Sequence, residues 1–350
     1  MQNKCLRICH VGFSVAWCLS LLIMGNFSLG CSRFVYQGSP QNYYTGRSVD
    51  WFEDMKTDMW AYPKGMKKDG GTGSGAIKWT SKYGSVTTSV YDVATIDGIN
   101  EKGLVAGLLY LAEAKYPEAS SKPTLSAGAW AQYVLDKFAS VKEAVTALKK
   151  DPFTLIAPAL PDGKPTTIHL SISDPQGDSA IFEYINGKLV IHHGKQYKVM
   201  TNSPTYDEQT SLANYWMDIG GDKMLPGTSR AADRFVRATY YLSVVPAFDD
   251  ERKATAAAIS IIRNLSVPMG VNDPHAPNIA TTLWRTISDH SKKRYYFDSA
   301  LSPNVFWVDL KNLDFSQGQA PKKLALRDHP ILAGDQSASF KEAEPFKWLK

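Results

Sequence analysis

The order of extended and helical segments in this chain of 350 residues predicts an α+β fold. Runs of alternating apolar and polar residues indicate blocks of strands, and apolar residues spaced three and four apart indicate helices between those blocks. The blocks lack the regular strand–helix–strand rhythm of a parallel sheet. We therefore expect antiparallel sheets covered by helices, in a single domain that spans residues 31–350.

The first half of the chain is mostly extended. A helix is predicted over 126–150, where apolar residues recur at helical spacing and Ser126 is a suitable cap. The strands expected before this helix lie at 31–36, 43–51, 78–90, 92–100 and 103–111.

The second half returns to strands around two further helices, at 229–245 and 249–265. Asn186-Gly187 between two alternating runs predicts the tight turn of a hairpin. The tail after Leu313 is rich in Lys, Pro and Asp, and we expect it to be peripheral. The strands expected in this half lie at 166–173, 179–185, 188–192, 197–201, 294–298 and 304–310.

Residues 1–30 have the pattern of a secretory signal peptide. Lys4 and Arg7 form a positive start, a short apolar run follows, and small residues stand three and one positions before Cys31. The run is shorter than the ~20 residues of a membrane span, and no later segment is long and apolar enough to form one. We expect cleavage between Gly30 and Cys31, with no stable span afterwards, and a periplasmic or secreted product.

Cysteine usage leaves one thiol in the mature chain. Three of the four cysteines lie in the predicted leader, so cleavage makes Cys31 the first residue and excludes an internal disulfide. Two interpretations remain: Cys31 is acylated in a lipid-anchored binding protein, or Cys31 is an N-terminal nucleophile. Ser28-Leu29 fits a lipoprotein signal only in part, which favours the nucleophile.

An N-terminal cysteine carries a nucleophile and a base on one residue. A thiol attacks as the thiolate, and the pKa of a free cysteine is about 8.5. An α-amine, with a pKa of about 7.7 to 8.0, is partly neutral near neutral pH and can accept the thiol proton. Such a site also needs a group that holds the amine, a cation that favours the thiolate, and donors for the oxyanion.

Several motifs follow the candidate nucleophile in a fixed order. Together they resemble the choloylglycine hydrolase family of N-terminal nucleophile (Ntn) hydrolases, and they are most similar to its penicillin V acylases from Gram-negative bacteria. The resemblance spans nearly the whole mature chain, and it implies an αββα four-layer sandwich and a homo-oligomer, typically a tetramer. The motifs are CSRFVY (31–36), GRSVDW (46–51), DGINEKGL (97–104), TNSPTYDEQ (201–209), LPGTSRAADRFVRA (225–238) and NIATTLWRTISDHSKKRYYF (278–297).

The resemblance supplies the groups that the nucleophile needs. Cys31 matches the family nucleophile, Arg47 the arginine beside the thiol, and Asp50 the carboxylate that orients the amine. A spacing of three would place Arg47 and Asp50 on opposite faces of an extended strand. Both reach one site only if the strand twists, bulges or ends between them.

The oxyanion is expected to be held by Asn202 and by the backbone or side chain of Asn100. Arg234 matches the second arginine of the family site. Each residue alone has a plainer interpretation, such as a turn for Asn202 or a surface position for Arg234, and the joint match favours the catalytic one. Trp51 and Trp60 are candidates for the acyl-binding pocket, although Trp60 also fits an ordinary core position.

These features predict an amidohydrolase that cleaves linear N-acyl amides. The resemblance implies penicillin V and N-acyl homoserine lactones as small-molecule substrates, with conjugated bile salts as the alternative. We expect no metal and no organic cofactor, because the seven histidines show no metal-ligand spacing. Without Lys4 and Arg7 the balance is 37 basic to 34 acidic residues, which is too even to predict nucleic-acid binding.

Overall fold

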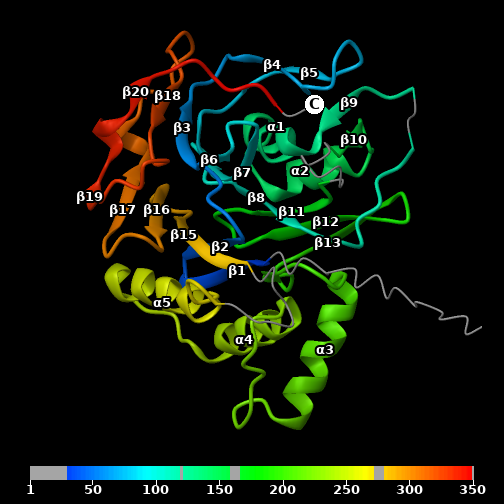
Figure 1. Ribbon diagram of the computed structural model, residues 1–350, viewed down its shortest axis with the longest axis vertical. Coiled ribbons are helices and arrows are strands. Elements are labelled where there is room, and N and C mark those ends of the chain that lie inside the picture. Colours follow the sequence, from blue (N-terminus) through cyan, green and yellow to red (C-terminus); the bar gives the residue numbers. More distant parts are fainter. Residues whose placement is uncertain (1–29, 119–120, 158–165, 272–279, 349–350) are drawn as a thin grey trace, which may run out of the picture.

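The computed structural model describes residues 30–118, 121–157, 166–271 and 280–348. Figure 1 shows two sheets packed face to face, with one group of helices above the upper sheet and another below the lower one. The fold is therefore an α+β sandwich of four layers. The predicted leader lies outside the described residues, apart from its last residue, Gly30.

A seven-stranded sheet contains the strand that carries Cys31. Its pairs are antiparallel except for the last, which is parallel. In spatial order its strands are β14 (Val199–Met200), β1 (Gly30–Ser39), β2 (Asn42–Trp51), β15 (Thr281–Asp289), β16 (Arg294–Ser299), β17 (Val305–Asp309) and β19 (Gly334–Asp335).

A nine-stranded antiparallel sheet faces it. Two short ribbons, β4 (Lys67–Asp69) with β5 (Lys78–Thr80) and β9 (Thr124–Ser126) with β10 (Thr154–Ile156), lie beside it. In spatial order the large sheet contains β13 (Lys188–His193), β12 (Ser179–Ile185), β11 (Ile168–Ser173), β8 (Val105–Tyr110), β7 (Ala94–Asn100), β6 (Ser85–Val90), β3 (Asp58–Tyr62), β18 (Lys322–Leu324) and β20 (Lys341–Glu342).

Five α-helices of the described residues form the outer layers. On the nine-stranded sheet, α1 (Trp130–Lys137) packs against β7 and β8, and α2 (Val141–Leu148) against β12. On the seven-stranded sheet, α4 (Ala231–Val244) and α5 (Glu251–Asn264) pack against β1, and α3 (Tyr206–Ile219) lies against α4. Each interface has its own apolar core, and the core between the two sheets includes Val49 of β2.

The structure confirms the α+β class and corrects several elements. The helix expected over 126–150 is broken, because Phe138 is extended and Ser140 caps a new helix by accepting a hydrogen bond from the Glu143 N–H. The strand expected over 78–90 is likewise split into β5 and β6. The sequence analysis did not predict the strands β3 and β15 or the helix α3.

The C-terminal tail was expected to be peripheral, but the structure shows that it is part of the sandwich. Its strand β18 pairs with β3 and so extends the nine-stranded sheet, and β19 pairs with β17 of the other sheet. The buried carboxylate of Asp58 accepts hydrogen bonds from the backbone of Leu326 and from the Arg327 side chain. This polar anchor fixes the tail to the edge of the sheet.

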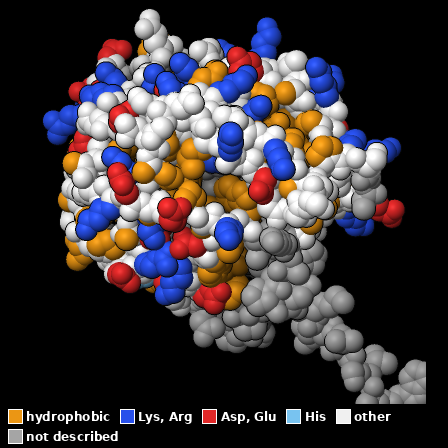
Figure 2. Space-filling model, turned by 90° about the horizontal axis from the view of Figure 1, so that it is seen from above, with side chains coloured by type: hydrophobic (Ala, Val, Ile, Leu, Met, Phe, Trp, Pro, Cys, Tyr) orange, Lys and Arg blue, Asp and Glu red, His pale blue; other side chains and the backbone are white. Residues whose placement is uncertain are grey.

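Side chains of both charges are interspersed over the face shown in Figure 2. Hydrophobic side chains gather around a hollow near its centre. Among the described helices, none is long and apolar enough to cross a membrane.

Candidate active site

Cys31 lies near the start of β1, directly opposite Val49 of β2. Its side chain is buried, with 8 % of the residue exposed, and its thiol is free. In this uncut chain its nitrogen is still a peptide nitrogen joined to Gly30. In a chain that began at Cys31, this nitrogen would be the α-amine.

Asn202 and Arg234 converge on the backbone of Cys31. The Cys31 N–H donates a hydrogen bond to Asn202 Oδ1, and Arg234 Nη2 donates to the same oxygen over 3.2 Å. Arg234 Nη1 donates to the Cys31 carbonyl over 2.6 Å and to Ser32 Oγ over 2.5 Å. Residues far apart in the chain therefore hold the nitrogen and the carbonyl of Cys31 in fixed positions.

Asp50 lies on the same side of the sheet as this backbone contact. Its Oδ1 accepts a hydrogen bond of 2.6 Å from Thr282 Oγ1, and its Oδ2 is 3.5 Å from Arg234 Nη1. Burial raises the pKa of Asp50, while the charge of Arg234 and the bond from Thr282 lower it. Oδ2 has no hydrogen-bond partner among the described residues, which leaves it available to an amine proton.

Gly30 occupies the space in front of this carboxylate. A Cβ atom at position 30 would lie 2.7 Å from Asp50 Oδ2 and 3.2 Å from Arg234 Nη2. Only glycine fits there in the uncut chain, so a larger residue would displace the carboxylate, the arginine or the strand start.

Arg47 approaches the thiol from the other side of β2. Its guanidinium donates to the carbonyls of Ile96 and Leu108 in the facing sheet, over 2.7 and 2.6 Å. Burial raises the pKa of the Cys31 thiol, and the positive charge of Arg47 is the strongest influence that lowers it. The arginine thus offsets part of the cost of forming a buried thiolate.

The predicted conflict between Arg47 and Asp50 is resolved without a break in β2. The β1–β2 register runs evenly from Arg33 opposite Arg47 to Gly30 opposite Asp50, so the two side chains do lie on opposite faces. The two residues lie near different parts of Cys31: Arg47 lines the same cavity as Cys31, whereas Asp50 pairs with Arg234, which bonds the Asn202 oxygen that accepts from the Cys31 nitrogen. The bulge lies instead in β15, at Leu283 between Thr282 and Trp284.

A mostly apolar cavity of about 120 Å³ opens beside Cys31 and Arg47. Its wall includes Trp51, as expected for an acyl-binding residue. The Trp51 indole donates to the Tyr91 hydroxyl over 2.9 Å, and Tyr91 donates to Glu53 over 2.7 Å. This chain of bonds fixes the orientation of the indole in the wall. The other apolar lining residues include Val49, Met55, Val90, Ile96, Leu108 and Ile168.

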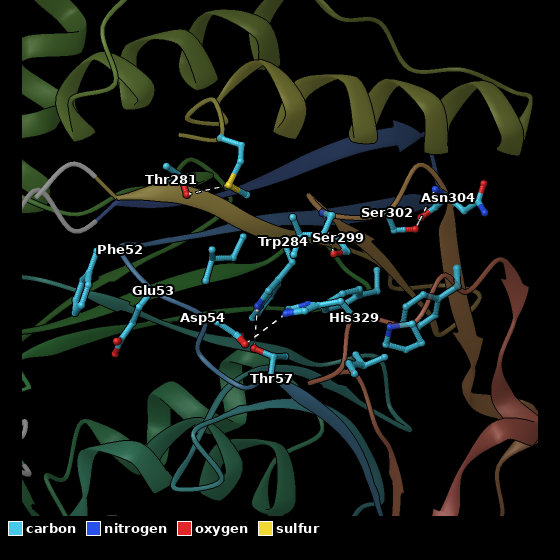
Figure 3. Close-up of a pocket in the computed structure, with 17 residues that line it drawn as sticks. Phe52, Glu53, Asp54, Thr57, Thr281, Trp284, Ser299, Ser302, Asn304 and His329 are labelled. Atoms are coloured by element: carbon cyan, nitrogen blue, oxygen red, sulfur yellow. Dashed lines mark hydrogen bonds and ion pairs between the residues drawn. The ribbon is translucent and has the colours of Figure 1, made fainter. Parts of the chain in front are cut away.

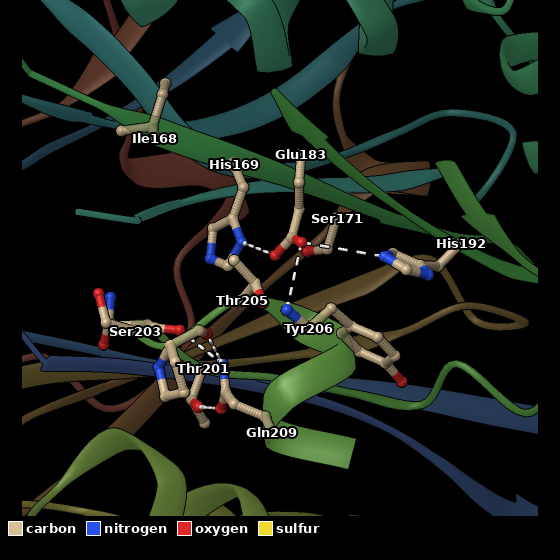
Figure 4. A network of polar contacts seen from close by, with 12 residues as sticks. Ile168, His169, Ser171, Glu183, His192, Thr201, Ser203, Thr205, Tyr206 and Gln209 are labelled. Atoms are coloured by element: carbon tan, nitrogen blue, oxygen red, sulfur yellow. Dashed lines mark hydrogen bonds and ion pairs between the residues drawn. The ribbon is translucent and has the colours of Figure 1, made fainter. Parts of the chain in front are cut away.

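A polar network places Asn202. Gln209 on α3 donates to the Asn202 carbonyl over 2.6 Å and also bonds Thr201. Glu183 of β12 accepts from His169 over 3.0 Å and from the Tyr206 backbone N–H over 3.2 Å, which ties the first turn of α3 to the nine-stranded sheet (Figure 4). Asn202 Nδ2 donates one proton to the Tyr110 carbonyl, and no described residue accepts its second N–H.

Asn100 is not at this site, so its expected role in the oxyanion hole is wrong. Its Nδ2 donates to the carbonyls of Leu135 and Phe138, over 2.9 and 2.8 Å, at the end of α1. Its Oδ1 accepts from the backbone N–H groups of Lys102 and Leu104. Every hydrogen-bonding position of this amide is used, and its own N–H is paired with the Leu104 carbonyl.

Trp60 is also absent from the cavity and occupies the core position that was its alternative. Its ring stacks on Tyr62 at 5.7 Å, and its indole donates to Ser89 over 3.2 Å.

The sequence analysis did not identify three groups at the site. Thr282 holds Asp50, Tyr91 holds Trp51, and the Tyr110 carbonyl holds Asn202. Thr282 lies in a quoted motif, NIATTLWRT, and its strand pairing with β2 was the signal that could have found it. Among the described residues, no group of three or more His, Cys, Asp or Glu side chains could hold a metal ion.

The chain belongs to the linear amide C–N hydrolases of the choloylglycine hydrolase family, whose family model matches residues 31–323. It is an enzyme of the Ntn-hydrolase fold that hydrolyses carbon–nitrogen bonds in linear amides. The sequence-based prediction of family, fold and reaction class is confirmed.

Among its relatives are penicillin V acylases. The one from Pectobacterium atrosepticum is 48 % identical, over 94 % of this chain and 95 % of the relative. The structure of the one from Agrobacterium tumefaciens superposes with a TM-score of 0.85 at 52 % identity, covering 91 % of this chain and 99 % of that one. A mutant conjugated bile acid hydrolase from Clostridium perfringens shares the fold, with a TM-score of 0.71 at 20 % identity, over 84 % of this chain and 96 % of its own.

Proposed function

We propose that the mature enzyme begins at Cys31 and hydrolyses N-acyl amides with a compact apolar acyl group, of which penicillin V is the model substrate. One observation carries the proposal: Asn202 holds the nitrogen of Cys31, and Arg234 holds both Asn202 and the Cys31 carbonyl, beside an apolar cavity that Cys31 lines. The names and identities of the penicillin V acylases support the same substrate class.

The proposed reaction begins when the α-amine of Cys31 takes the thiol proton and the sulfur attacks the amide carbon. The free N–H of Asn202 donates to the oxyanion, and Arg47 favours the thiolate. The protonated amine, oriented by Asp50 and Asn202, then gives its proton to the leaving nitrogen, so an amine departs and an acyl thioester remains. Water adds to the thioester with the same amine as base, releasing the carboxylic acid and restoring the thiol.

The size of the acyl cavity favours a single ring or a short chain. Its volume of about 120 Å³ is close to the ~150 Å³ that accommodates one benzene ring in a protein core. Pockets for larger, drug-sized ligands measure about 300 Å³ or more. A phenoxyacetyl group suits this space better than the fused rings of a bile acid.

A hydrolysis panel tests this substrate assignment. The mature protein is assayed against penicillin V, acyl homoserine lactones of several chain lengths, and glycine- and taurine-conjugated bile salts. We expect kcat/KM to be highest for penicillin V and the short acyl lactones. A clear preference for the bile salts would overturn the assignment.

The assignment of the nucleophile has its own test. We expect Cys31→Ala to abolish turnover of every substrate in the panel, while its circular dichroism spectrum and Tm stay close to those of the parent. Retained turnover in the folded variant would show that another group attacks the amide.

The proposal extends to export and assembly. A leader that ends at Gly30, followed by one remaining thiol, supports a periplasmic or secreted enzyme with an unmodified N-terminus. Light scattering on the mature protein tests the tetramer that the family resemblance implies, and a monomer would contradict it.

A further inference from the structure

A second cavity, of about 250 Å³, lies apart from the catalytic one. It is bounded by the loop after β2, by β15 and β16, and by the C-terminal segment around His329. Figure 3 shows Phe52 and Glu53 at one end, Ser302 and Asn304 at the other, and Trp284 between them. The described residues that line it include none of the catalytic groups.

The walls of this second cavity suit an aromatic ring. Trp284, Phe297 and Phe306 form the inner wall. Phe52, Met269 and Leu301 also line it, although each is more than half exposed, at 52, 51 and 55 %. Large apolar side chains that are partly exposed around a cavity are typical of a binding site, and the volume exceeds that of a protein cavity of ~150 Å³ that binds benzene.

The charges around the cavity select the ligand further. Its charged lining residues are Glu53 and Asp54, and no lysine or arginine of the described chain lines it. Asp54 is paired with Lys56 at 2.8 Å and with His329 at 3.4 Å. No ion pair joins Glu53 to a described residue, so the end of the cavity that holds Phe52 also holds a carboxylate without a cation. The aromatic rings of the lining themselves attract cations.

Three contacts connect the second cavity to the catalytic one. Phe52 stacks on Trp51 at 5.2 Å, and Glu53 accepts the hydrogen bond from Tyr91; both partners line the acyl cavity. The guanidinium of Arg47 lies 5.5 Å from the ring of Trp284. A ligand that moves the loop after β2 therefore changes the wall of the acyl cavity.

We propose that this cavity is a second ligand site, which takes a small aryl or aralkyl amine as its cation and adjusts the acyl cavity through Trp51 and Tyr91.

Three probes of nearly equal shape but different charge test the ligand class: benzylamine, benzyl alcohol and benzoate. Calorimetric titration of the mature protein should give the order benzylamine, benzyl alcohol, benzoate, from tightest to weakest. Binding of benzoate as tight as that of benzylamine would overturn the proposal. The titration needs no turnover, so its outcome is independent of the substrate proposed above.

Two variants assign the site. Leu301→Trp fills the cavity and should weaken benzylamine binding at least tenfold, whereas Leu212→Trp, on the exposed face of α3, should not change it. Glu53→Gln keeps an acceptor for Tyr91 but removes the charge, so it should weaken benzylamine severalfold and leave benzyl alcohol unchanged. Unaltered benzylamine binding in Leu301→Trp would show that the amine binds outside this cavity, and it would refute the proposal.

The connection between the cavities has a kinetic test. Saturating benzylamine should change the KM of the parent enzyme for its best amide substrate at least twofold, and this effect should vanish in Leu301→Trp. An equal effect in Leu301→Trp would show that benzylamine competes inside the acyl cavity, and no effect in the parent would refute the coupling.

Discussion

Asn202 uses both ends of its side-chain amide at the site. Its oxygen accepts a hydrogen bond from the Cys31 N–H, and its nitrogen donates one proton to the Tyr110 carbonyl, while the other finds no acceptor among the described residues. We expect Asn202→Ala to lower kcat by a factor of about 100 or more, since an oxyanion donor and a holder of the amine are both lost. Steady-state kinetics on the folded variant checks this, and a change in KM alone would contradict the role.

Asn100 provides the matched comparison, because the same substitution removes an amide that is buried but remote from Cys31. Asn100→Ala would leave two backbone carbonyls and two N–H groups without partners, at a cost of about 1–3 kcal/mol for each unsatisfied group. We expect unfolding by urea to show a loss of more than about 3 kcal/mol. The kcat of the folded fraction should stay within a few-fold of that of the parent. A loss of kcat as large as that of Asn202→Ala would show that Asn100 acts in catalysis after all.

Motif order was sufficient to select most of the residues that the structure brings together. Five residues of the site each belong to one of the family motifs, and each motif forms a short segment of strand, turn or helix at the site. These residues are Cys31, Arg47, Asp50, Asn202 and Arg234. The motif around Asn100 was misread because it holds the turn after β7 and the end of α1. The structural role of Asn100 depends on carbonyl groups at the end of α1, more than 30 residues away in sequence, which the motif does not include.

At the scale of elements, α3 is the support on which Asn202 depends. Glu183 anchors its first turn. Burial raises the pKa of Glu183, but the contacts with His169 and His192 and the hydrogen bond from the Tyr206 N–H outweigh that effect and lower the pKa to about 2. A carboxyl group whose pKa falls on folding stabilises the native state above its unfolded pKa, here 4.5, and loses that contribution as the pH falls toward 2.

Glu183→Gln should remove this contribution. The shift corresponds to about 3 kcal/mol of stability at neutral pH, which the variant should lose in large part. Denaturant unfolding followed from pH 5 to pH 2 should be less steeply pH-dependent in the variant than in the parent. Identical slopes would show that Glu183 does not titrate with folding.

The helix α3 also shows where local patterns fail. Its capping box, with Thr205 and Glu208, is a readable start signal. Its body buries only Tyr206, Gln209 and Ala213, so the apolar periodicity that reveals the other helices is weak. The strand β15 was missed for a related reason: its alternation of partly and fully buried residues does not follow a clean change of polarity in the sequence.

At the scale of the whole molecule, residues between the two sheets must remain uncharged or paired. His290 is buried and neutral in this region: its Nδ1 contacts the Gly103 carbonyl at 2.7 Å, and its Nε2 contacts Thr45 Oγ1 at 2.8 Å. Burial lowers the pKa of His290 to about 4, with a smaller effect of the same sign from Arg33. The unfolded chain therefore takes up a proton here that the native state excludes.

The stability of the enzyme should consequently fall as the pH drops from about 6.5 to 4. The shift corresponds to about 3 kcal/mol from this histidine. His290→Gln retains an amide donor for Gly103 and removes the titration, so its stability should change less over this interval. Thermal unfolding of both proteins at pH 7 and pH 4.5 measures the difference, and parallel losses would rule out His290 as the cause.

The four-layer arrangement could be predicted from the family motifs, and the α+β class from the alternation of blocks alone. The pairing of the C-terminal tail could not, because β18 and β20 have three and two residues and no pattern of their own. Their positions depend on Asp58 and on the edge of β3 that pairs with β18, which are properties of the assembled sheet.

The central claim is that one cut creates both nucleophile and base, because Cys31 becomes the first residue with a free amine. Intact-mass spectrometry of the active protein exported by a Gram-negative host tests this most directly. We predict the mass of residues 31–350 without modification. An active protein that retains its leader, or that carries a lipid-sized addition on Cys31, would contradict the account.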